Sequence, residues 1–129
     1  MGSTQAAAGF LVYSTTRLSP AGEPTIYDTT SLAGLTDIRA APGRLTCVLP
    51  VAPRVCNRNG TLHGGCTATL VDVVGTAALL TAHTRGGVSL SITAHYLAPM
   101  PQGGRCLIDA RVSGKEAGGR WGAVVFLYI

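Results

Sequence analysis

The chain has 129 residues, enough for one domain with a sizeable core, and 47% of them are apolar while only 12% are charged. Ten basic and six acidic residues give a formal charge of +4, and nine of the ten basic residues are arginines scattered singly along the chain. Nucleic-acid binding normally needs clustered cations, so we expect no nucleic-acid partner. Scattered arginines fit a small anionic ligand better.

Neither a metal site nor a membrane segment is expected. The four cysteines lack C-x-x-C spacing and form no dense disulfide framework, and the three histidines are too widely spaced for a helical ligand pair. No apolar run reaches the roughly 20 residues of a membrane span, and the N-terminus lacks the pattern of a secretory signal. We therefore expect reduced thiols in a soluble intracellular protein, cytoplasmic or, from the faint transit-peptide character of residues 1–22, mitochondrial.

The first half of the chain contains one clear strand. Residues 1–34 are rich in small and polar residues without a sustained hydrophobic period, and we leave their structure unassigned. From Arg44 to Val51 apolar residues alternate with others, which predicts a strand entered through the turn 41–43 and ended near Pro53. A loop then leads to Gly64 and Gly65.

A long helix is expected from Cys66 to about His83, because this stretch has no proline and its apolar residues recur at helical spacing. Gly86 and Gly87 end it. The helix is apolar nearly all round, which indicates burial on more than one side. A single sheet cannot cover every face of a helix, so a second copy of the chain is the economical candidate for the rest.

Three strand-like runs follow the helix, at Val88–Leu97, Arg105–Ser113 and Arg120–Ile129, with glycine- and proline-rich turns between them. The order of one strand, one long helix and three strands predicts an α+β fold with an antiparallel sheet around a central helix. We assign this domain to residues 35–129 and describe residues 1–34 as a poorly defined N-terminal segment.

Asp72 is the one acid in the predicted helix. Its neighbours on the same helical face are all small: Ala68, Thr69, Gly75 and Thr76. Small neighbours leave a slot at the carboxylate, which favours a chemical role. The alternative is that Asp72 only bonds a nearby backbone or hydroxyl group.

The start of the helix offers a complementary feature. Its first N–H groups lack intrahelical partners, so the amide of Gly64 could hold an acyl carbonyl, unless Gly64 and Gly65 only ease a tight turn. Gly64 and Asp72 are eight positions apart, about 12 Å along a helix. One carbonyl cannot touch both, so a shared site would combine the amide of one subunit with the carboxylate of another.

The sequence resembles the hotdog-fold acyl-CoA thioesterases of the phenylacetate-degradation type and their thioesterase-superfamily-member-2 branch. The resemblance spans about Thr36 to Ile129. It rests on these motifs: Ala41-Pro42-Gly43-Arg44, Asn57, Gly60-Thr61-Leu62-His63-Gly64-Gly65, Thr67-Ala68-Thr69-Leu70-Val71-Asp72, Gly87-Val88-Ser89, and Tyr96 before Pro99. It implies a hotdog fold, with the long helix wrapped by the sheet.

The resemblance also implies roles for five residues near the two glycines. Asp72 would be the general base or nucleophile that delivers water to the thioester, and the Gly64 amide would polarise the thioester carbonyl. Asn57 would position the water or the thioester. Ser89 would be an auxiliary polar contact from the neighbouring subunit, and His63 would hold the loop.

Contacts with CoA are implied at Tyr96 and at the turn that contains Lys115 and Arg120, two plausible phosphate partners. CoA would be part of the substrate, so no separate cofactor is expected; an acyl-carrier protein is the alternative donor of the acyl group. The assembly implied is a homodimer or homotetramer. Relatives usually add one more strand after the equivalent of Phe126–Ile129, and they begin with a charged amphipathic helix; we expect both to be missing here, leaving an unpaired edge.

Three functions stay open at this point. The favoured hypothesis is hydrolysis of medium- or long-chain fatty or aryl acyl-CoA thioesters to free acid and CoA. A lyase, dehydratase or isomerase on the same scaffold is an alternative, since fold does not determine chemistry. The D-x4-H pair of hotdog hydratases is absent, because Ala77 stands five positions after Asp72. A non-catalytic binder of acyl ligands is the third.

Overall fold

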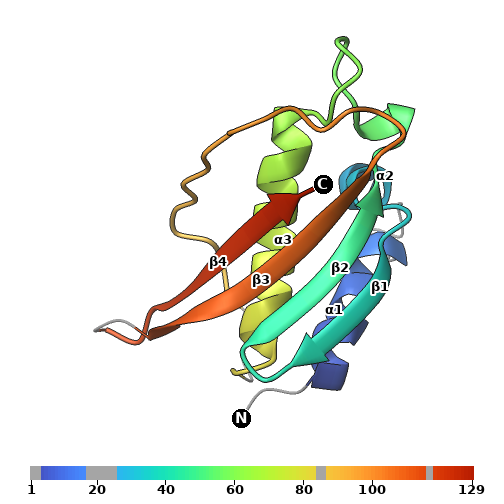
Figure 1. Cartoon of the computed structure of the whole chain (residues 1–129). Helices are drawn as coiled ribbons and strands as arrows, with labels where there is room; N and C mark the ends of the chain where they lie inside the picture. Colours follow the sequence, from blue (N-terminus) through green and yellow to red (C-terminus); the bar gives the residue numbers. More distant parts are fainter. Residues whose placement is uncertain (1–3, 17–25, 84–86, 116–117) are drawn as a thin grey trace.

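The computed structural model describes residues 4–16, 26–83, 87–115 and 118–129 (Figure 1). In chain order the elements are α1 (Thr4–Thr16), α2 (Ile26–Ser31), β1 (Thr36–Ala41), β2 (Arg44–Pro50), the 3-10 helix η1 (Pro53–Val55), α3 (Gly64–Leu80), β3 (Arg105–Lys115) and β4 (Trp121–Tyr128). The strands form one antiparallel sheet in the order β1-β2-β3-β4, and α3 and α1 pack on the same side of it. The expected α+β layout is confirmed. None of the described helices is long and apolar enough to cross a membrane.

The core lies between α3 and the inner face of the sheet. β2 and β3 pair so that Leu45 lies opposite Ala110 and Cys47 opposite Ile108, and all four side chains are buried. Because side chains alternate along a strand, the intervening residues point to the outer face. Gly75 brings α3 close to β4, since a Cβ at this position would lie 3.4 Å from a methyl group of Val125.

The first described residues, which the sequence left unassigned, form the helix α1. It carries no charged residue, and it packs against α3 and β1 through side chains that include the buried Ala7 and Leu11. These two residues are four positions apart and therefore share one face of the helix. The N-terminal segment thus contains an uncharged helix.

Two elements differ from the sequence-based expectation. β1 was not predicted, because Thr36–Ala41 has little apolar alternation; it forms by pairing with β2. The prediction of a strand at Val88–Leu97 was wrong: this segment is the long loop beside β4 in Figure 1, and no described strand pairs with it. Period-two alternation specifies two faces of an extended chain but does not supply a hydrogen-bonding neighbour.

The loop and the adjacent strand both present apolar surface. Val88, Leu90 and Leu97 are each at least 75% exposed. β4 pairs with β3 along one side only among the described strands, and its side chains Val124 and Phe126 are about half exposed on the outer face. β4 is therefore an edge strand of the described sheet.

Candidate active site

The start of α3 is capped by the side chain of the residue that precedes the helix. His63 is the N-cap residue, and its Nδ1 accepts a hydrogen bond of 2.9 Å from the Gly65 N–H. The His63 carbonyl accepts from Thr67 N–H at 3.0 Å, as in the first turn of a helix. No hydrogen bond among the described residues uses the Gly64 N–H. That amide carries the positive end of the helix dipole and is free to donate to a ligand.

The loop before α3 is closed by Asn57. Its Oδ1 accepts from the N–H groups of Asn59 (2.9 Å) and Thr61 (3.2 Å), and its Nδ2 donates to Thr61 Oγ1 (2.9 Å). Both polar atoms of the side chain are therefore engaged inside the loop. Asn57 thus shapes the segment that presents His63 and Gly64, and its role toward a water or thioester stays a prediction.

Asp72 lies on a face of α3 that does not point into the core, and its side chain is half-buried. Its Oδ1 accepts a hydrogen bond from Ser89 Oγ. Within the described part of the chain, Asp72 takes part in no ion pair. The resemblance placed Ser89 in the neighbouring subunit; in the structure it reaches Asp72 of its own chain, so Ser89 and Asp72 would enter a shared site together.

Asp72 and Ser89 open into a cavity of about 640 Å³ between α3, the loop after it and the start of β4. Its lining mixes apolar and polar side chains: Leu79 and Leu80 of α3 are apolar, and Val88, Leu90 and Ile92 alternate with Ser89, Ser91 and Thr93 along the loop. The polar and aromatic residues of the lining include Asp72, Ser89, Ser91, His83, Arg120 and Trp121. The rings of His83 and Trp121 lie 5.2 Å apart at the end of α3.

The residues implied as CoA contacts fall in different places. Arg120 lines the Asp72 cavity, whereas the Tyr96 hydroxyl donates to the Gly64 carbonyl at 3.0 Å, at the other end of the site. Lys115 ends β3, opposite Trp121, and its side chain lies outside the described atoms. The structure therefore forms two groups, one around Asp72 and one around Gly64, as the spacing along the helix predicts.

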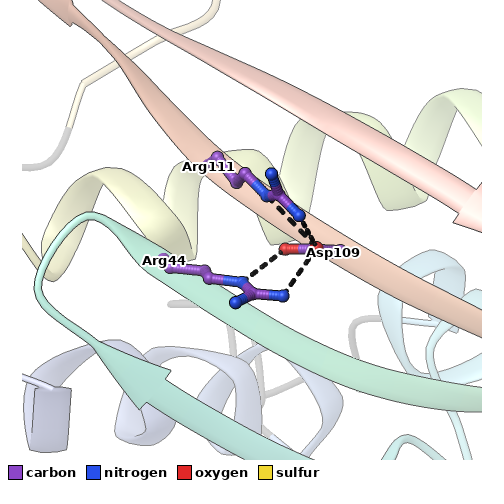
Figure 2. A network of polar contacts seen from close by, with 3 residues as sticks. All are labelled: Arg44, Asp109 and Arg111. Carbon is purple, nitrogen blue, oxygen red and sulfur yellow. Dashed lines mark hydrogen bonds and ion pairs between the residues drawn. The ribbon is translucent and has the colours of Figure 1, made fainter.

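A second acid was missed by the sequence analysis. Asp109 on β3 is buried, and it accepts two hydrogen bonds of 2.9 Å from Arg44 and bonds of 2.7 and 3.2 Å from Arg111 (Figure 2). These bonds, first those from Arg111 and then those from Arg44, lower the pKa of Asp109 to about 2. Arg111 also lies over the ring of Phe126, 5.6 Å from its centroid. This network lies on the outer face of the sheet.

The three buried cysteines offer no reactive thiolate to the site. All four cysteines are free, and burial raises the pKa of Cys47 to about 12 and the pKa values of Cys66 and Cys106 to about 11. Within the described ranges no three potential ligands gather into a metal site. The chemistry available near α3 is thus that of a carboxylate, a hydroxyl and a backbone amide.

The chain is similar to known proteins in sequence and in fold. Residues 59–116 match the thioesterase superfamily. The chain has the hotdog fold of zebra fish thioesterase superfamily member 2, with a TM-score of 0.72 and 28% identity over 95% of this chain and 93% of that one. The corresponding protein from Mus musculus gives a TM-score of 0.69, with the same identity and coverage. Residues 59–116 are thus similar to the thioesterase superfamily, and the fold of the chain is similar to that of these two proteins.

Acyl-coenzyme A thioesterase 13 from Homo sapiens is 43% identical over 82 residues, which are 63% of this chain. The chain spans 59% of the length of that relative. The thioesterase-superfamily match contains Gly64, Asp72, Ser89 and Tyr96, whereas Asn57 and Arg120 lie outside it. The two groups of the candidate site thus both have members inside the matched region.

Proposed function

We propose that the protein hydrolyses acyl-CoA thioesters to a free acid and CoA, with Asp72 as the base and the Gly64 N–H as the donor to the oxyanion. The main support for this proposal is the environment of the Asp72 carboxylate. Its carboxylate faces a cavity, bonds a serine and has no cation partner among the described residues. A structural acid is usually neutralised, as Asp109 is.

The proposed chemistry uses two atoms of the protein. Asp72 accepts a proton from water as the water oxygen bonds to the thioester carbon, and the carbonyl oxygen becomes an oxyanion that the Gly64 N–H stabilises. Collapse breaks the C–S bond, and the CoA sulfur takes the proton back from Asp72. Direct attack by the carboxylate through an anhydride, which water then hydrolyses, leads to the same products.

The two groups would meet across a subunit interface, as the spacing of about 12 Å along one helix requires. A second copy with its helix antiparallel would bring the Gly64 of one subunit to the Asp72 of the other and form two sites per dimer. The exposed apolar row of Val88, Leu90 and Leu97 supports such an association, because a row of this kind is costly to leave in water. A homodimer is therefore the smallest competent unit that we propose, and a homotetramer would contain two of them.

Substrate selection rests on two parts of the same cavity. The apolar side chains of the lining, such as Leu79, Val88 and Leu90, support fatty or aryl acyl groups of medium or long size, delivered by CoA or by a carrier protein. Arg120 also lines the cavity, and it supports binding of an anionic CoA phosphate. Lys115 remains the other proposed CoA contact, whereas the Tyr96 hydroxyl is already bonded to the Gly64 carbonyl.

The test is release of free thiol from a panel of fatty and aryl acyl-CoAs, followed with a thiol-detecting reagent. The protein's own background should be low, because three of its thiols are buried and have raised pKa values, and the fourth, Cys56, donates to the Ala52 carbonyl. Wild type should release thiol from at least one acyl-CoA. No release from any chain length would contradict the proposal and leave acyl-ligand binding as the alternative.

A subunit-mixing experiment tests the composite site. Gly64→Pro removes the amide hydrogen at N1, the helical position that tolerates proline best, and Asp72→Asn removes the base. Each variant should be nearly inactive alone, and co-folded mixtures should regain part of the activity, since one of the two sites in a heterodimer keeps both groups. Intact heterodimers without activity would contradict sharing across subunits.

A further inference from the structure

The peptide that joins Gly64 and Gly65 is held at both of its polar atoms. Its carbonyl oxygen accepts from the Tyr96 hydroxyl at 3.0 Å, and its N–H donates to His63 Nδ1 at 2.9 Å. We propose that Tyr96 is a positioning residue that, with His63, fixes this peptide and thereby the direction of the Gly64 N–H. The inference rests on the proposed function for its catalytic meaning, and on the hydrogen bonds alone for its structural part.

Both glycines are covered by a ring on the side where a side chain would stand. A Cβ at Gly64 would lie 3.5 Å from the nearest carbon of the Tyr96 ring, and a Cβ at Gly65 would lie 3.0 Å from His63 Nδ1. The first is an ordinary contact, and the second is so tight that the His63 ring would have to shift by a few tenths of an ångström. The two rings therefore pack against the glycine pair as well as bonding to it.

Tyr96 is tied to this loop by the chain that follows it. Leu62 N–H donates to the Met100 carbonyl at 2.8 Å, and Gln102 N–H donates to the Gly60 carbonyl at 2.9 Å. The segment after Tyr96 thus runs beside the loop before Gly64 as a short antiparallel pair. This pairing keeps the Tyr96 hydroxyl within reach of the Gly64 carbonyl.

The consequence concerns the backbone torsions of Gly64. A glycine populates many backbone conformations, so the peptides on its two sides must be fixed by other groups. The peptide before it is fixed because the His63 carbonyl accepts from Thr67 N–H at 3.0 Å. The peptide after it is fixed by Tyr96 and His63. Only the Gly64 N–H is left without a partner among the described residues, and its direction follows from both peptides.

This role differs from a CoA contact in what it does to the kinetics. A hydroxyl that only binds CoA holds substrate and transition state equally, so its loss would raise KM and leave kcat unchanged. A hydroxyl that aims the oxyanion donor affects the transition state, so its loss would lower kcat. Tyr96→Phe keeps the ring and removes the bond. We expect kcat to fall about fivefold and KM to stay within twofold, in line with one hydrogen bond.

Tyr27→Phe is the matched control. The Tyr27 hydroxyl pairs with Thr69 Oγ1 on the same helix, so this variant also removes a tyrosine hydrogen bond to α3, while the Gly64–Gly65 peptide keeps both of its bonds. Its kcat should stay within twofold of wild type. A rise in KM alone for Tyr96→Phe, or an equal loss of kcat in both variants, would overturn the positioning role.

Amide hydrogen exchange without substrate gives a readout that does not depend on activity. In Tyr96→Phe the Gly65 N–H should exchange at least about threefold faster than in wild type, because its peptide has lost one of its two hydrogen bonds. In Tyr27→Phe the exchange rate of the Gly65 N–H should not change. Unchanged exchange at Gly65 overturns the inference, whatever the kinetics show. If wild type released no thiol but exchange rose in Tyr96→Phe, the proposed function would fail and the positioning of the peptide would stand.

Discussion

Asp72 and Asp109 are the same residue type in one small domain, and their surroundings differ in every respect that decides what a carboxylate does. Asp109 is buried between two arginines that donate four hydrogen bonds to it, and its pKa is lowered to about 2. Asp72 is half-buried at a cavity and accepts one side-chain bond, from Ser89. Both carboxylate oxygens of Asp109 accept bonds from protein, whereas Asp72 accepts a side-chain bond at one oxygen and keeps the other for a ligand.

The difference shows that the neighbours of each acid on its strand or helix decide whether it stabilises the fold or can react with a ligand. Asp109 sits on the outer face of β3, where the paired β2 brings Arg44 beside it and Arg111 follows two residues later. Asp72 sits on α3 among small residues, where no long cation from the same helix can reach it. We therefore expect substitutions at Asp109 to act on stability and substitutions at Asp72 to act on turnover.

The largest effect should come from Asp72→Asn, which keeps the shape of the side chain and removes its basicity. Thiol release from the best acyl-CoA should fall at least about 100-fold in kcat, the loss typical of a removed proton-transfer group. The free energy of unfolding should stay within about 0.5 kcal/mol of wild type, because no ion pair is broken. An active Asp72→Asn variant would remove the distinction between the two acids.

Asp109→Asn should show the reverse pattern. Urea unfolding should report a loss of about 1–2 kcal/mol, because bonds from two guanidinium groups to a buried carboxylate become bonds to a neutral amide, and the exposed sides of the arginines moderate the cost. The kcat of thiol release should stay within twofold. A large loss of activity in a variant that is still folded would mean that the outer face of the sheet also takes part in the reaction.

The pH dependence of stability should distinguish Asp109 further. Its folded pKa of about 2 lies below its ordinary value of 3.8, so the ionised form favours the folded state. The resulting stability is fully present above about pH 4 and is lost as the pH falls toward 2. The gap in unfolding free energy between wild type and Asp109→Asn should therefore narrow by about 1 kcal/mol between pH 5 and pH 2. A gap that is constant with pH would show that charge does not stabilise this network.

Sequence patterns predicted the elements whose signal is local. The apolar period of α3 and the alternation in β2, β3 and β4 were all recovered in the structure. α1 was missed because its alanines, serines and threonines give almost no contrast between buried and exposed faces. Val88–Leu97 was assigned to a strand because alternation reports the faces of a chain, whereas pairing depends on a neighbour far along the sequence.

The candidate site shows the same division. Spacing along one helix separated Gly64 from Asp72, and the structure keeps them in two groups. The hydrogen bond from Tyr96 to Gly64 joins residues 32 positions apart, and the hydrogen bond from Arg44 to Asp109 joins residues 65 positions apart. Such contacts follow from strand register and loop path, so neither could be read from the chain. Side-chain periodicity alone does place Asp109 on the face opposite Ile108 and Ala110.

The smallest effect in this comparison should come from Ser89→Ala. The hydroxyl is the one side-chain donor to the Asp72 carboxylate among the described residues, and both groups are partly exposed, so its loss should loosen the carboxylate without discharging it. We expect kcat for thiol release to fall about two- to fivefold, as for one hydrogen bond in contact with water. Ser91→Ala is the control, because Ser91 lines the same cavity without bonding Asp72, and it should keep kcat within twofold. Equal losses in both variants would assign the effect to cavity polarity, and a loss near that of Asp72→Asn would make Ser89 a partner in the proton transfer itself.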